Sequence, residues 1–97
     1  MMKHVVCFKL REPSEELLLK TREILLSMRG NVPTAKNVEV GIDFLHSARS
    51  YDIILVVMLA DPADLDVYQN DEYHCSVVKK HMHAIAETSV ALDYLVD

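Results

Sequence analysis

The sequence is poor in several features that mark common classes of protein. Its two cysteines, Cys7 and Cys75, form no CxxC pair and predict no disulfide framework, so we expect two reduced thiols. Lysine and arginine number 10 against 15 acidic residues, which gives a net charge of −5. No basic stripe is therefore present that could neutralise the phosphates of nucleic acid or bind an anionic membrane surface, and we expect neither partner.

Several chemical motifs are also absent. No apolar run approaches the ~20 residues that span a bilayer, and the opening MMKHVVCFKL lacks the long apolar core of a signal peptide. There is no glycine-rich phosphate loop, no nucleophile elbow and no clustered carboxylate pair. His81 and His83 would lie on different faces of a helix, which makes them a poor zinc site. We expect a cytoplasmic protein without a metal site.

The composition is that of an ordinary globular domain, with 51% hydrophobic and 26% charged residues among 97. No linker, repeat or low-complexity tract divides the chain, so residues 1–97 are predicted to form one domain. A domain of this size buries only a little over ~60% of its unfolded surface, so a partner subunit would add stability.

Four segments have the period of two that is typical of strands. Residues 2–10 place His4, Val6, Phe8 and Leu10 on one face, and residues 36–44 and 88–96 alternate in the same way. Residues 51–59 are apolar on both faces, which predicts a central strand.

Helical segments fill two of the three intervals. Ser14 is a good N-cap for a helix that Gly30 would end. Asp61 and Pro62 predict the start of a short helix, which breaks at Asp71. A longer helix then runs to about Glu87, with its predicted core stripe formed by Cys75, Val78, Met82 and Ile85.

The resulting order, β-α-β-β-α-β, predicts an α+β fold of the ferredoxin-like type, with the first and third strands at the centre of an antiparallel sheet. Both helical segments would cover one face of this sheet. The other face carries Val5 and Cys7 together with one side of the third strand. Such an apolar face would need a partner, so we expect a homodimer joined sheet to sheet.

This topology also brings candidate catalytic residues together. His4 begins the first strand, beside the end of the third strand, and Tyr68 and His74 follow that same end. We expect a cleft between sheet and helices in which His74 acts as a general base and Tyr68 donates a hydrogen bond to a carbonyl. His4, Val6, Phe8 and Ile53 would line the ligand site. Histidine and tyrosine are also common as structural groups in small cores, so this alternative stays open.

Four features together resemble the stress-responsive A/B barrel (Dabb) family: the opening KHVVCFKL, the β-α-β-β-α-β order, the segment DLDVYQNDEYHCSVVKKH and the closing ALDY. The resemblance covers essentially the whole chain and implies a dimeric α/β barrel. A plant member of the family closes a linear polyketide without a cofactor, using a histidine base and a tyrosine. The resemblance carries these roles over to His74 and Tyr68, and that of a further pocket histidine to His4.

The sequence departs from that plant enzyme at two places. Tyr51, Asp52 and Ile53 stand where the enzyme has a tyrosine followed two residues later by a pocket histidine, and Asp71-Glu72 replaces a histidine-proline pair. Polyketide cyclisation is therefore not carried over. One hypothesis is a small-molecule protein that binds a carbonyl compound, with cofactor-free cyclase- or lyase-like catalysis. The other is a non-enzymatic stress-response or assembly module.

Overall fold

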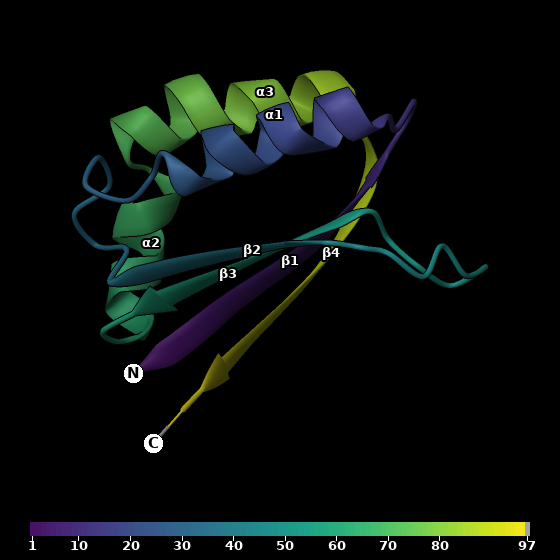
Figure 1. The fold of residues 1–97 in the computed structure, drawn as a ribbon. Helices are drawn as coiled ribbons and strands as arrows, with labels where there is room; N and C mark the ends of the chain where they lie inside the picture. The colour runs from purple at the N-terminus through teal and green to yellow at the C-terminus, as the bar shows by residue number, and fades with distance from the viewer. Residues whose placement is uncertain (97) are drawn as a thin grey trace.

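The computed structural model describes residues 1–96, which form a four-stranded antiparallel sheet with helices on one face (Figure 1). The strands lie in the order β2-β3-β1-β4, so β1 and β3 are central. This confirms the predicted ferredoxin-like fold. The elements along the chain are β1 (Met2–Leu10), α1 (Glu15–Leu26), β2 (Asn37–Ile42), β3 (Ile53–Leu59), α2 (Pro62–Gln69), the π-helix η1 (His74–Lys79), α3 (Lys80–Ile85) and β4 (Ala86–Leu95).

Side-chain caps explain where two helices begin. Ser14 accepts a hydrogen bond from the backbone N–H of Leu17 at 3.1 Å, and Asp61 accepts one from that of Asp64 at the same distance. Helix α1 ends at Leu26, earlier than predicted, because the chain continues in hydrogen-bonded turns rather than as a regular helix. Gly30 lies in those turns with a φ of +80°, a conformation that disfavours residues with a Cβ atom.

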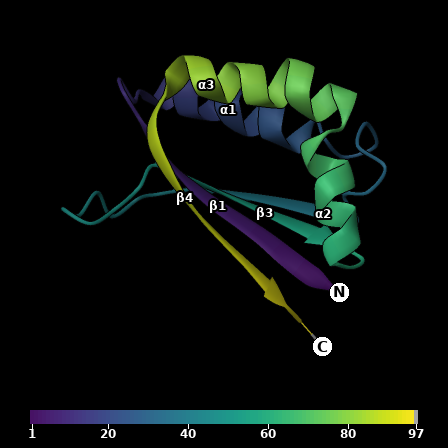
Figure 2. The same cartoon turned by 180° about the vertical axis from the view of Figure 1, so that it is seen from behind.

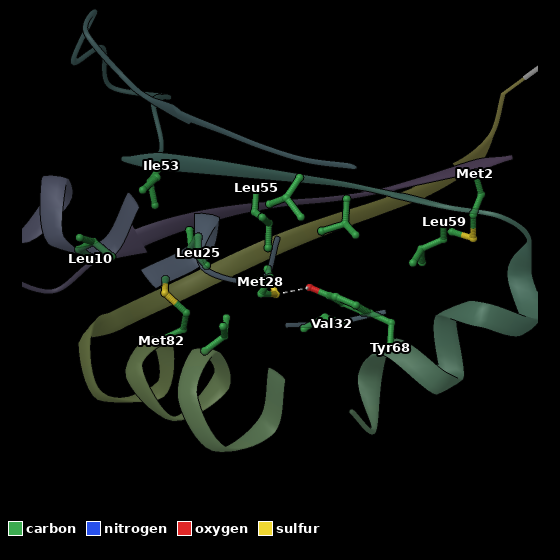
Figure 3. Close-up of a cluster of buried hydrophobic side chains, with 13 residues drawn as sticks. Met2, Leu10, Leu25, Met28, Val32, Ile53, Leu55, Leu59, Tyr68 and Met82 are labelled. Carbon is green, nitrogen blue, oxygen red and sulfur yellow. Dashed lines mark hydrogen bonds between the residues drawn. The ribbon is translucent and has the colours of Figure 1, made fainter. Parts of the chain in front are cut away.

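The core lies between the sheet and the helices (Figure 3). Alternate residues of β3 point into it, and Val57 and Leu59 are completely buried. Leu25 and Met28 approach from α1 and the turn that follows it, and Met82 from α3. None of the helices among residues 1–96 is long and apolar enough to cross a membrane.

The opposite face of the sheet carries no helix, as the reversed view shows (Figure 2). Residues with the opposite parity to the core residues point to this face. In β4 these are Val90, Leu92 and Tyr94, whose exposed fractions are 48%, 65% and 42%. The register sets Val5 of β1 between Val56 of β3 and Leu92. The helix-free face is thus an apolar surface that is open in the isolated chain.

The last helical segment differs from its prediction. The expected core residue Cys75 is exposed, and its thiol donates a hydrogen bond to the carbonyl of Gln69 at 3.3 Å. A π turn holds one more residue than an α turn, and this extra residue rotates Cys75 away from the core. The segment also ends at Ile85 rather than near Glu87, because Ala86 already pairs with Leu10 in the sheet. Both Cys7 and Cys75 are free thiols, as predicted.

Candidate functional site

A cavity of about 510 Å³ lies between the sheet and the segment formed by η1 and α3. It is large enough for a small organic ligand. Its wall combines apolar side chains with two buried histidines, one exposed histidine and a tyrosine. The lining includes His4, Val6 and Phe8 of β1, Leu55 of β3, Tyr68 of α2 and His74 of η1.

Three of the predicted site residues meet in this wall. The ring of Tyr68 packs against both histidines, with its centroid 5.6 Å from that of His4 and 4.4 Å from that of His74. All three side chains are buried. The antiparallel sheet places the start of β1 beside the end of β3, and α2 follows that end, so the predicted convergence of these residues is what the structure contains.

His4 has a partner that the sequence interpretation did not include. Its Nδ1 forms a hydrogen bond with the carboxylate of Asp93, which is its neighbour in the antiparallel pairing of β1 and β4. A carboxylate only accepts, so Nδ1 carries the proton and Nε2 is the acceptor in the neutral ring. Sequence alone would have found this pair only if the register of the two strands had been derived residue by residue.

His74 stands at the first position of η1. Its backbone N–H donates to the Asp71 carboxylate at 3.0 Å, which caps the helical segment that begins at Glu72 and continues into η1. Only 8% of His74 is exposed, and its Nδ1 is buried without a hydrogen-bond partner among the described residues. Such an orphaned group is uncommon and is a reason to consider a functional role.

Burial is the main cause that lowers the pKa of His74 below its ordinary value. The charges of Lys79 and His4 lower this pKa further. The carbonyl of Gln69 and the carboxylate of Asp71 act in the opposite direction, without reversing the shift. At neutral pH the ring is therefore neutral and can accept a proton.

The hydroxyl of Tyr68 points in a different direction from the one expected for a donor to a ligand carbonyl. This hydroxyl is fully buried and donates to the thioether sulfur of Met28 at 3.6 Å (Figure 3). Burial, and secondarily the charge of Asp71, raises the pKa of Tyr68 far above its usual value. The hydroxyl is thus directed at the core rather than at the cavity, and the aromatic ring is what touches the histidines.

Of the predicted apolar walls, Val6 and Phe8 line the cavity and Ile53 does not. Ile53 lies in the core at 2% exposure, and Leu55, two residues further along β3 and paired with Val6, takes its place in the wall. Leu55 is the β3 residue in the cavity lining, whereas Ile53 and Val57, two residues to either side of it, are buried in the core.

Of the remaining histidines, His46 and His81 lie outside this site, whereas His83 lines the cavity from an exposed position. His81 Nε2 lies 3.0 Å from Thr21 Oγ1 between α3 and α1, while His46 is exposed in the loop between β2 and β3. Among residues 1–96, no three histidine, cysteine, aspartate or glutamate side chains gather into a group that could hold a metal ion.

Comparison with known proteins agrees with this architecture. The sequence model of the family described as "Stress responsive A/B Barrel Domain" (Dabb) matches residues 2–96. The chain belongs to this A/B barrel family. A comparison with curated protein sequences found no significant match.

Solved structures similar to this A/B barrel chain share its fold at low sequence identity. A dimeric protein of unknown function and ferredoxin-like fold from Bacteroides fragilis is 21% identical, with a TM-score of 0.79 over 98% of this chain and 95% of its own. A Dabb family protein from Mesorhizobium loti is 19% identical, with a TM-score of 0.74 over 98% and 95%. The hydroxynitrile lyase from Passiflora edulis is 16% identical, with a TM-score of 0.78 over 99% and 93%.

Proposed function

We propose that this A/B barrel protein binds a small carbonyl compound in the cavity between sheet and helices and catalyses proton transfer on it without a cofactor. The observation that carries this proposal is the pair of buried histidines, His4 and His74, that share one cavity wall. They are held in different ways, His4 by Asp93 and His74 with an unpartnered ring nitrogen. Paired titratable groups in contrasting environments are typical of acid–base catalysis.

In the proposed reaction, neutral His74 takes a proton from the carbon next to the carbonyl. The C–H bond breaks, and its electron pair moves toward the carbonyl oxygen. Protonated His4 donates its Nε2–H to that oxygen, while Asp93 accepts from Nδ1–H and stabilises the imidazolium. The proton on His74 is then delivered back to carbon and the O–H proton returns to Nε2 of His4, so both histidines regain their starting states and no external oxidant or reductant is needed. Tyr68 is assigned a positioning role, because its ring packs against both histidines.

The proposal includes a homodimer formed through the helix-free face. The exposure of Val90, Leu92 and Tyr94 supports it, since apolar surface of this extent is uncommon in a monomer. The related Bacteroides fragilis structure is described as dimeric. The passion-fruit enzyme among the similar structures is a hydroxynitrile lyase, which is in keeping with lyase-like chemistry on a carbonyl compound.

The test combines ligand binding with turnover. We expect a panel of aromatic and aliphatic ketones and aldehydes to contain compounds that shift the NMR signals of the His4 and His74 rings. The signals of His46, which lies in the loop outside the cavity, should not move. For a compound that reacts, His74→Gln should lower the rate by about 100-fold or more, the usual contribution of a general base. His46→Gln is the matched control and should leave the rate unchanged.

A non-enzymatic stress-response or assembly module is the second candidate. The hydrogen bond from the Tyr68 hydroxyl to Met28 favours this second candidate, because it stabilises the core and directs the hydroxyl away from any ligand in the cavity. If no compound in the panel shifts the two ring signals, and His74→Gln changes only thermal stability, the assembly module is the correct interpretation.

A further inference from the structure

The π-helix changes which side chains reach the cavity. In a regular α-helix, residues three and four apart share a face, and a residue five positions on points elsewhere. In η1 the hydrogen bonds join residues five apart, which brings Lys79 back toward the side of His74. Both residues line the cavity. A lysine that helical periodicity assigns to solvent is thus placed beside the buried histidine.

The charges around the cavity contrast with those of the whole chain. The lining residues contain two permanent cations, Arg11 and Lys79, and one carboxylate, Glu87, although the chain carries a net charge of −5. Neither cation forms an ion pair among residues 1–96. Arg11 instead donates to the carbonyl of Ala84 at 2.8 Å, while the charge of Lys79 is one of those that act on His74. The lining therefore has an excess of one positive charge, because a protonated His4 is balanced by its partner Asp93 and the other lining histidines are counted as neutral.

We propose that the ligand of this cavity is a monoanionic oxo acid, whose carboxylate binds Lys79 while its carbonyl group meets His4 and His74. This inference rests on the proposed function and narrows its substrate class. One excess positive charge matches one carboxylate, whereas Glu87 in the same lining would repel a dianionic phosphate. The apolar lining from Val6, Phe8 and Leu55 suits the hydrocarbon part of such a compound.

The coupling between Lys79 and His74 provides an independent readout. The positive charge of Lys79 is one of the causes that lower the pKa of His74, so a carboxylate bound to Lys79 should raise this pKa. Three other groups act on the pKa of His74: the carbonyl of Gln69 in α2, His4 of β1 and Asp71 before η1. The ring of Tyr68 also packs against it. None of them changes in the comparison of Lys79→Gln with the wild type. The Lys79→Gln substitution itself should therefore raise the pKa of His74. Adding the oxo acid to this variant should not raise that pKa further.

The experiment uses a matched pair of probes, 2-oxo-4-phenylbutanoate and the neutral 4-phenylbutan-2-one, with the full chain in its native assembly. We expect the acid to bind the wild type about fivefold more tightly than the ketone, which is the gain from one partly exposed ion pair. Lys79→Gln should remove this preference and leave the affinity for the ketone unchanged. The control is Lys80→Gln, which removes the same charge from an exposed residue that does not line the cavity. It should retain the preference.

The outcomes separate this inference from the proposed function. Equal binding of acid and ketone, unchanged by Lys79→Gln, would overturn the oxo-acid assignment and leave the carbonyl site intact. An equal loss of acid binding in the Lys79 and Lys80 variants would show only a general effect of charge, and would also overturn it. If neither probe shifts the signals of His4 and His74, both the inference and the proposed function fail. The preference should fall with added salt if it is electrostatic.

Discussion

His74 combines two unfavourable features for stability, burial and a ring nitrogen without a partner. An unsatisfied buried polar atom costs about 1–3 kcal/mol. We expect His74→Phe, which keeps the ring and removes the orphaned nitrogen, to raise the free energy of unfolding by about 1 kcal/mol at pH 7. Urea denaturation measures this. A variant that is strongly destabilised would show that the histidine makes a contact essential to the fold.

The same residue links stability to pH. The pKa of His74 is lower in the folded state than its ordinary value of 6.5, so the unfolded state binds a proton more readily. Its contribution is complete above pH 6.5 and is lost as the pH falls through that value toward the folded pKa. The free energy of unfolding should therefore fall between pH 7 and pH 5, and less steeply in His74→Phe. The exposed control His46→Phe should keep the slope of the wild type.

Tyr68 permits a test of positioning against direct catalysis. If its hydroxyl only anchors the ring on Met28, Tyr68→Phe should change turnover by no more than about twofold and cost about 1 kcal/mol of stability. Tyr68→Ala should cost about 3–5 kcal/mol, because it removes a fully buried aromatic ring. A large loss of turnover in Tyr68→Phe at unchanged stability would instead make the hydroxyl a proton donor to the substrate.

At this scale, the sequence predicted the residues that strand topology brings together and missed those that depend on detailed side-chain packing. His4 and His74 follow from the order of the elements. Asp93 depends on the register between β1 and β4, and the contact of Tyr68 with Met28 on how a helix sits over the core. Ile53 was assigned to the cavity wall on apolar character alone, which does not distinguish the wall from the core.

At the scale of the element, the caps of α1 and α2 were predictable because Ser14 and Asp61 act through hydrogen bonds to residues three positions away. The π-helix was not predictable, because no residue type specifies it. Its cause lies in the packing around it, with His74 and Val78 buried on the core side while Cys75 is exposed. The helical pattern that placed Cys75 in the core assumed one regular helix throughout.

The extra residue of η1 predicts an unusual tolerance to deletion. Removing the exposed Ser76 should convert the π turn into an α turn, with the residues that follow still facing the core. We expect the free energy of unfolding to change by only about 1 kcal/mol, within the range of ordinary single changes. The control is deletion of Glu23 from the regular helix α1, which would rotate Ile24 and Leu25 out of register and prevent stable folding. Equal damage from both deletions would argue against the π-helix.

At the scale of the whole molecule, the sheet has one face covered by helices and the other left open. The sequence predicted this asymmetry because β3 is apolar on both sides while both helical segments share one face. We therefore expect two copies of the chain to associate through the open face. If two copies associate through it, each removes from water the apolar side chains of β1, β3 and β4 that an isolated chain exposes.

Val5 gives the sharpest test of that assembly, since it lies near the middle of the open face between Val56 and Leu92. We expect the wild type to sediment as a dimer at micromolar concentration. Val5→Asp should dissociate it, because an unpaired charge would enter an apolar contact. The matched control, Val67→Asp, makes the same change on an exposed position of α2 and should leave the dimer intact. A wild-type chain that sediments as a stable monomer, or a Val5→Asp variant that remains dimeric, would show that the open face is not the interface.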